Sequence, residues 1–138
     1  MNNETFKNKL LIIAEAGVNH NGSEKIAKKL ILEAKKIGAD IIKFQIFNTK
    51  KLIVENAKKP KYIKENLKLN NQSQFELLKK LELPFSVIKK LNNFCIKNNI
   101  EFLLSPFDID SVKKINQLNL KRIKIPSGEI DNYPMLVE

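Results

Sequence analysis

Short apolar runs alternate with amphipathic stretches along this chain, and this alternation restricts the fold more than any other feature of the sequence. The four apolar runs span residues 10–14, 39–45, 101–104 and 122–125. Continuous runs of this length are typical of strands that are buried on both faces. Between the runs, apolar residues recur at helical spacing over residues 26–37, 85–95 and 112–118. Strands separated by helices predict a parallel α/β sheet with right-handed crossovers.

Capping residues mark the expected ends of these helices. Ser23 is a good N-cap for the first helix, and Gly38 follows its last turn. Pro84 suits the first turn of the second helix, and either Asp108 or Asp110 suits the start of the third. The sequence therefore predicts where each helix begins as well as its apolar face.

The connection over residues 46–83 is long for a plain βα unit, and long loops in compact domains tend to be functional. Within this connection we expect two short helices, near residues 62–66 and 74–80. A further helix is expected to begin near residues 133–134.

The formal net charge of +10 raises the question of whether the chain binds nucleic acid. Arg122 is the single arginine among the 25 basic residues, whereas base readout and bidentate phosphate binding favour arginine. The lysines are scattered over the predicted helix surfaces. We therefore expect a solvated lysine-rich surface and no nucleic-acid partner. DNA binding that weakens steeply with salt would support the opposite interpretation.

With 43% hydrophobic residues, the chain has enough apolar side chains for a core. No apolar run approaches the roughly 20 residues of a membrane span, and residues 10–14 are too few for a secretory signal. Cys95, the single cysteine, falls in an apolar helical pattern, so we expect it to be buried and unreactive. These features predict a cytoplasmic protein with no membrane partner.

Polar residues directly follow each apolar run, and parallel α/β folds bind ligands beyond the carboxyl ends of their strands. A lysine inside a buried strand must be paired or must face a cavity. Lys43 and Lys124 are therefore expected to bind the phosphate or carboxylate of an anion. The other candidates are Gln45, Ser105 and Ser127 for hydrogen bonds, Gly17, Gly22 and Gly128 for close approach of backbone to the ligand, and Glu15 and Glu129 as acid/base groups.

Each candidate also has a structural interpretation. The two lysines are compatible with ion pairs to Glu15 or Glu129 inside the fold, and residues 127–128 with a simple turn. His20 is unsuited to be a sole metal ligand, but it suits either a substrate contact or a loop cap. The sequence contains no Walker loop, paired CxxC or HExxH motif. Four strands are compatible with an open doubly wound sheet or with half of an eight-stranded barrel.

Five segments resemble the sialic acid synthases, a family of N-acetylneuraminate synthases and their legionaminic and pseudaminic acid relatives. The segments are IIAEAGVNHNGS from Ile12, GADIIKFQ from Gly38, SQFELLKKLEL from Ser73, LLSPFD from Leu103 and KIPSGEIDNYP from Lys124. They run through nearly the whole chain, in the order and spacing of the family. The resemblance implies that residues 1–138 form the N-terminal half of a (β/α)8 TIM barrel with parallel strands.

The resemblance also implies a reaction, in which phosphoenolpyruvate condenses with an N-acylated mannosamine-type sugar to give a nine-carbon sialic acid for surface polysaccharide. A divalent metal, Mn²⁺ or Mg²⁺, is expected to orient the open-chain sugar aldehyde. The residues that match those holding phosphoenolpyruvate are Lys43, Gln45, Ser105, Lys124 and Ser127. Glu15 and Glu129 match the carboxylates at the reacting centre, and Tyr62 and Asn66 fall in the loop that approaches the sugar.

In this family the metal-binding histidines lie on later strands, and a C-terminal antifreeze-like domain reaches into the site of the partner subunit in a homodimer. The chain ends before both, so we expect a fragment with no metal ligands and no synthase activity of its own. A small α/β module that binds an anionic or phosphorylated molecule without catalysis is the alternative. The AGVNHNG segment disfavours pseudaminic acid and leaves neuraminic and legionaminic acid open.

Overall fold

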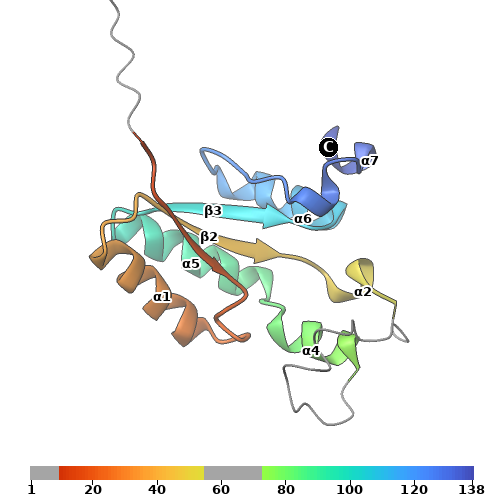
Figure 1. The fold of residues 1–138 in the computed structure, drawn as a ribbon, viewed down its shortest axis with the longest axis horizontal. Helices are drawn as coiled ribbons and strands as arrows, with labels where there is room; N and C mark the ends of the chain where they lie inside the picture. Colours follow the sequence, from red (N-terminus) through yellow and green to blue (C-terminus); the bar gives the residue numbers. More distant parts are fainter. Residues whose placement is uncertain (1–9, 55–72) are drawn as a thin grey trace, which may run out of the picture.

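Three parallel strands form one sheet in the computed structural model, which describes residues 10–54 and 73–138 (Figure 1). The strands are β1 (Ile13–Gly17), β2 (Ile41–Ile46) and β3 (Glu101–Pro106). They lie side by side in chain order, β1-β2-β3. Chain order is the arrangement of a closed parallel barrel, whereas an open doubly wound sheet reverses direction at a switch point. The structure therefore favours the barrel over the open sheet.

Two long helices, α1 (Glu24–Lys36) and α5 (Phe85–Lys97), lie side by side across one face of the sheet (Figure 1). Ile31 of α1 and Leu91 of α5 are fully buried in one apolar cluster with Phe44 of β2. Each helix buries one apolar stripe and leaves its lysines in water, as an amphipathic helix on a sheet does. The main core of the described residues thus lies on one side of the sheet only.

The predicted caps are confirmed. The Ser23 hydroxyl accepts a hydrogen bond from the backbone N–H of Ile26 at the start of α1. Gly38 follows α1 with a φ of +83°, the left-handed conformation that favours glycine after a helix. Asp108, rather than Asp110, is the N-cap of the helix after β3.

Short helices complete the described fold. They are α2 (Thr49–Leu52), α4 (Gln74–Leu81), α6 (Ile109–Ile115) and α7 (Tyr133–Leu136), with 3₁₀ turns at Asn116–Leu118 and Ser127–Glu129. α4 begins with a capping box, in which Ser73 and Glu76 bond each other's backbone N–H groups. The predictions of helices near 74–80 and 133–134 are confirmed, and the helix predicted near 62–66 lies outside the described residues.

The prediction of a fourth strand over residues 122–125 is wrong. This segment has no regular secondary structure and makes one backbone hydrogen bond to β3, from the Lys124 N–H to the Leu104 carbonyl oxygen at 2.9 Å. A parallel strand bonds its neighbour at alternate residues, and one bond does not make a ladder. Ile123 and Ile125 are also partly exposed, so the apolar pattern that predicted the strand is not buried here.

The expectation that Cys95 is buried is confirmed, because its side chain lies in the core of α5. Burial raises the pKa of the Cys95 thiol to about 12, so the thiol stays protonated and unreactive at neutral pH. Among residues 10–54 and 73–138, no helix is long and apolar enough to cross a membrane.

Candidate functional site

The face of the sheet opposite α1 and α5 carries most of the predicted polar candidates. Successive residues of a strand point to opposite faces, so Phe44 reaches the helices while Lys43 and Gln45 reach the other face. The strand register places Glu15 beside Lys43, and Gln45 beside Ser105. Three strands therefore bring four predicted site residues together near their carboxyl ends.

Lys43 lies at the centre of this group and is only 7% exposed. Its Nζ lies 2.7 Å from Glu15 Oε2, and it donates a hydrogen bond to Ser105 Oγ at 3.4 Å. Burying an ammonium group is costly unless it is paired, and Glu15 provides the opposite charge. An ammonium has three N–H donors, so these two partners leave one donor for a ligand oxygen. The expected pairing of Lys43 with Glu15 is thus present, and it leaves Lys43 able to bind an anion.

Gly17 lies where two of these side chains meet. Its φ of +52° is in the left-handed region, and a Cβ there would lie 3.5 Å from Glu15 Oε1 and 3.8 Å from Gln45 Nε2. Gly22, which the sequence placed beside the ligand, instead lies against α4. A Cβ at Gly22 would be 2.1 Å from the carbonyl oxygen of Lys80. Gly22 therefore allows the loop after β1 to approach α4, and Gly17 allows close approach at the polar group.

The predicted residues after β3 form a second group. Lys124 and Ser127 are exposed, and Glu129 Oε2 accepts a hydrogen bond from Asn132 Nδ2 at 2.7 Å. The backbone bond from Lys124 to Leu104 places this lysine beside the end of β3. Within the described residues, no hydrogen bond or ion pair joins this group to Lys43 and its partners, and Lys124 pairs with neither predicted carboxylate.

Tyr62 and Asn66, predicted to approach the sugar, lie outside the described residues. Two carboxylates that sequence reasoning did not place at the site, Glu82 and Asp108, bond the loop that follows β2. Asp108 was expected at the end of the third strand and as a helix cap, without a role at the site, and no sequence signal pointed from Glu82 to its partner, Thr49. The Glu82–Thr49 bond joins residues 33 positions apart in the chain, and the Asp108–Asn48 bond joins residues 60 positions apart. Such distant pairs leave no local pattern in the sequence.

His20 closes the loop that follows β1. Its ring is 1% exposed and lies against Phe44, with ring centroids 5.9 Å apart. Nδ1 accepts a hydrogen bond from the Gly22 N–H at 3.0 Å, which requires a neutral ring with its proton on Nε2. Nε2 is buried without a hydrogen-bond partner among the described residues. Of the two sequence interpretations, the loop cap is the one that this hydrogen bond supports.

This arrangement makes stability depend on pH. Burial lowers the pKa of His20 below its ordinary value of 6.5. The unfolded chain therefore takes up a proton at a higher pH than the folded chain, so the free energy of unfolding should fall as the pH drops below about 6.5. The slope should reach at most about 1.4 kcal/mol per pH unit. Urea unfolding midpoints between about pH 7.5 and pH 5.5 measure it.

The control for this pH effect is His20→Asn, whose side-chain oxygen can still accept the Gly22 hydrogen bond but does not titrate. His20 is the single histidine of the chain, so the slope should disappear in this variant. An equal slope in both proteins would show that His20 does not cause it.

The described residues do not supply a metal site. No three histidine, cysteine, aspartate or glutamate side chains lie together where they could hold an ion in this part of the chain. His20 is committed to the loop through Nδ1, and Glu15 to Lys43. A divalent metal therefore finds no fitting donor set among them, and the expectation that its ligands lie elsewhere stays a prediction.

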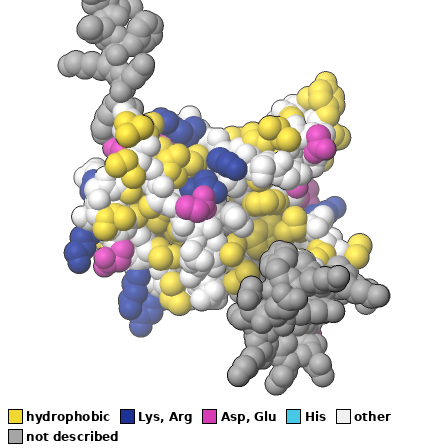
Figure 2. Space-filling model, viewed as in Figure 1, with side chains coloured by type: hydrophobic (Ala, Val, Ile, Leu, Met, Phe, Trp, Pro, Cys, Tyr) yellow, Lys and Arg dark blue, Asp and Glu magenta, His cyan; other side chains and the backbone are white. Residues whose placement is uncertain are grey.

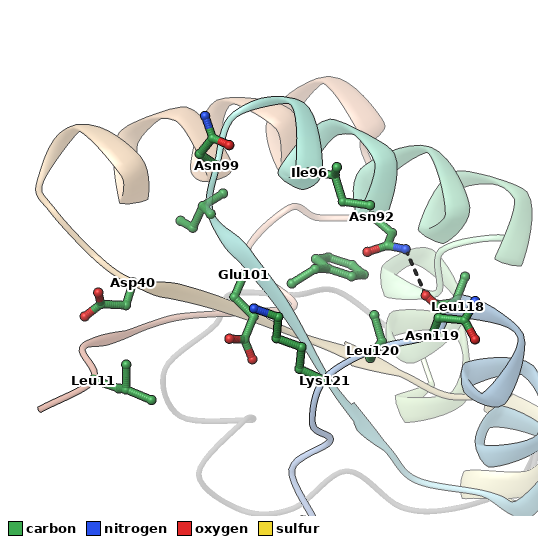
Figure 3. A pocket seen from close by; sticks show the side chains of 12 residues that line it. Leu11, Asp40, Asn92, Ile96, Asn99, Glu101, Leu118, Asn119, Leu120 and Lys121 are labelled. Carbon is green, nitrogen blue, oxygen red and sulfur yellow. Dashed lines mark hydrogen bonds between the residues drawn. The ribbon is translucent and has the colours of Figure 1, made fainter. Parts of the chain in front are cut away.

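Neither the face drawn in Figure 2 nor the cavity at the amino ends of the strands offers a better site. On the face drawn in Figure 2, lysine and arginine side chains are dispersed among apolar and acidic ones and form no stripe. A cavity of about 430 Å³ lies at the amino ends of the strands, bordered by Glu101, Lys121 and Asn92, whose Nδ2 donates to the Leu118 carbonyl oxygen (Figure 3). This is the end of a parallel sheet that carries stability rather than ligands.

Consecutive parallel strands, with helices on one face and a buried lysine paired with a glutamate on the other, define part of a parallel α/β barrel. The comparisons with known proteins make this specific. Residues 30–138 match the NeuB family, and the chain belongs to that family.

Two curated relatives of the chain are named as legionaminic acid synthases. N,N'-diacetyllegionaminic acid synthase of Campylobacter jejuni is 51% identical over 128 residues, which are 93% of this chain and 38% of that protein. The Legionella pneumophila enzyme of the same name is 44% identical, over 91% of this chain and 35% of that protein. The chain thus spans less than two-fifths of the length of these relatives, and the predicted resemblance is confirmed.

The fold agrees with a solved relative. The crystal structure of N-acetylneuraminic acid (sialic acid) synthetase from Leptospira borgpetersenii, in complex with citrate, superposes with a TM-score of 0.77 at 32% identity. It covers 94% of this chain, and this chain covers 40% of it. The prediction of an α/β fold that forms part of a TIM barrel is therefore confirmed.

Proposed function

We propose that this chain supplies the phosphoenolpyruvate-binding part of a sialic acid synthase-type enzyme. The observation that carries the proposal is the Lys43 ammonium, buried between Glu15 and Ser105 at the carboxyl ends of parallel strands. A lysine in this environment is costly to keep without a function or a partner of opposite charge. Its remaining donor suits one oxygen of a phosphate or carboxylate.

The other predicted residues extend this anion site. Gln45 lies next to Ser105 in the strand register and would donate from its amide, while Lys124 and Ser127 would approach from the segment after β3. Phosphoenolpyruvate carries a phosphate and a carboxylate, so two lysines on different segments match its two charged ends. The Leptospira relative is known in complex with citrate, another multiply charged anion, which supports this class of ligand.

The proposed chemistry joins C3 of phosphoenolpyruvate to the aldehyde carbon of an N-acylated mannosamine-type sugar. Water adds to C2, and inorganic phosphate leaves, which gives the 2-keto acid. Glu15 and Glu129 are the candidates to take the proton of that water and to protonate the aldehyde oxygen. Manganese or magnesium, the intact homodimer and a cytoplasmic location belong to the same proposal, and the metal takes its ligands from residues other than those described.

We infer that the sugar is of the legionaminic or neuraminic type. The two legionaminic acid synthases are 51% and 44% identical to this chain, and the pseudaminic acid synthase of Helicobacter pylori is 29% identical. This order agrees with the AGVNHNG segment, which disfavours pseudaminic acid.

A chimera tests the proposed function. In it, this chain replaces the matching 38% of the Campylobacter jejuni synthase, which supplies the remainder of the protein. We expect phosphate release from phosphoenolpyruvate that depends on the acceptor sugar and exceeds the sugar-free background by about 100-fold or more. The chain alone should bind phosphoenolpyruvate and release no phosphate.

Two controls are needed to interpret the activity of the chimera. The unmodified Campylobacter jejuni enzyme defines full activity, and circular dichroism shows whether the chimera is folded. A folded chimera that binds phosphoenolpyruvate without sugar-dependent phosphate release would contradict the proposal and favour a non-catalytic anion-binding module.

A further inference from the structure

A buried carboxylate ties together the ends of two strands that carry the anion site. Asp108, two residues after β3, is 7% exposed and uses both oxygens. Its Oδ2 accepts the backbone N–H of Asn48 at 2.8 Å and the Ser111 hydroxyl at 2.7 Å, while Oδ1 accepts the Ser111 N–H at 2.8 Å. The Ser111 bonds cap α6, but the Asn48 bond crosses to the loop after β2. Asp108 therefore does more than begin a helix.

A second carboxylate holds Thr49, the first residue of α2, which directly follows Asn48. Glu82 Oε2 accepts the backbone N–H of Thr49 at 3.0 Å and its hydroxyl at 2.7 Å, and Thr49 is fully buried. Burial raises the pKa of Glu82, but the hydrogen bonds from Thr49 and the Lys79 ammonium outweigh burial and hold that pKa below its ordinary value. Two consecutive N–H groups, of Asn48 and Thr49, thus each donate to a carboxylate from a different element.

These bonds lie just beyond the last bond between the strands. The Phe107 N–H donates to the Ile46 carbonyl oxygen at 3.2 Å, and the Asp108–Asn48 bond continues the contact past it. Gln45 and Ser105 lie opposite each other in the sheet. Gln45 precedes Asn48 by three residues, and Ser105 precedes Asp108 by three residues. A shift of one strand end relative to the other would therefore change the separation of the two side chains.

We propose that Asp108 is a positioning residue, which fixes the end of β2 against the end of β3 so that Lys43, Gln45 and Ser105 converge on one anion. This inference rests on the proposed function for the identity of the anion. It predicts that Asp108 affects anion affinity although its carboxylate is directed at backbone N–H groups and a hydroxyl rather than at the ligand.

The test compares Asp108→Ala with two matched variants of the full chain. Alanine has no acceptor oxygen, so the bonds of this side chain to Asn48 and to Ser111 are both lost. Ser111→Ala removes one bond of the same carboxylate and leaves the Asn48 bond in place, and Asp110→Asn makes the same charge change at an exposed neighbour. The measurements are amide hydrogen exchange at Asn48, thermal midpoint, and the affinity for phosphoenolpyruvate by calorimetry.

In Asp108→Ala we expect exchange at Asn48 to rise about tenfold and the dissociation constant for phosphoenolpyruvate to rise about fivefold or more. Ser111→Ala should lower the thermal midpoint but leave the exchange at Asn48 and the dissociation constant unchanged. Asp110→Asn should also leave the exchange and the dissociation constant unchanged. Unchanged exchange at Asn48 in Asp108→Ala, or an equal loss of affinity in Ser111→Ala, would overturn the inference. If the unsubstituted chain does not bind phosphoenolpyruvate, the proposed function fails, and exchange at Asn48 still decides whether Asp108 holds the end of β2.

Discussion

Lys43→Met should weaken binding of phosphoenolpyruvate by about 100-fold, which corresponds to about 3 kcal/mol. Methionine keeps the apolar stem and removes the ammonium that lies between Glu15 and Ser105. The change deletes a buried positive charge at the place where the anion is expected, and it leaves Glu15 as an uncompensated negative charge there. Calorimetric titration of the folded chain with phosphoenolpyruvate measures the loss.

Stability should change far less than affinity in this variant. The Glu15 side chain is 58% exposed, so water can solvate it once its partner is gone, and a buried ammonium is itself costly. We expect the free energy of unfolding to stay within about 1 kcal/mol of the original value. Loss of binding with an unchanged fold would separate a ligand-binding role for Lys43 from the purely structural ion pair that its contact with Glu15 also allows.

Lys97→Met is the matched control, because Lys97 is exposed on α5 and its loss changes the net charge of +10 by the same amount. General attraction of an anion to a basic protein would weaken equally in both variants and would be screened by salt. An affinity of Lys97→Met equal to that of Lys43→Met would contradict a specific anion site at Lys43.

Gly22→Ala should destabilise the fold by about 3 kcal/mol and lower the thermal midpoint by about 10 °C. Two effects add in this variant. Gly22 has a φ of +74°, which costs an alanine about 1 kcal/mol, and the new Cβ would lie 2.1 Å from the Lys80 carbonyl oxygen. A backbone oxygen cannot rotate away as a flexible side chain can, so the loop after β1 and α4 must separate.

Gly38→Ala isolates the first effect, the backbone strain, so the difference between the two variants measures the second. Gly38 has a similar φ of +83°, and nothing lies within 4 Å of a Cβ placed there. Its replacement should cost only the backbone strain, about 1 kcal/mol, and shift the thermal midpoint by about 4 °C. Thermal unfolding of both variants under the same conditions gives the comparison. Equal shifts would mean that the contact between Gly22 and α4 contributes nothing to stability.

The order of strands and helices could be predicted from the sequence because its causes are local. Apolar runs of four to seven residues mark buried strands, and residues such as Ser23 and Gly38 cap a helix through atoms a few positions away. The predicted strand over residues 122–125 shows the limit of this reasoning. A strand exists only when a neighbour provides its hydrogen bonds, and a pattern of side chains does not show how many backbone bonds form.

The polar group formed by Glu15, Lys43 and Ser105 was partly predictable for a related reason. In a parallel fold all strand ends meet at one edge, so polar residues after apolar runs are expected to lie together, and Glu15, Lys43 and Ser105 do. The sequence left open whether Lys43 pairs with a carboxylate, and only the strand register put Glu15 beside it. Lys124 lies within another predicted apolar run and Glu129 follows that run, yet the structure joins neither residue to this group within the described residues.

The sequence by itself thus determined that Lys43 lies in a buried strand, since an apolar run on both sides allows no other place for it. It also determined the family, because five segments match in order. Only the tertiary structure decided which residues hold this lysine and the strand end after it. The bond from Asp108 to Asn48 spans 60 residues, and that from Glu82 to Thr49 spans 33. Each joins a side chain to a backbone N–H group, and any residue but proline carries such a group, so the partner leaves no trace in the sequence.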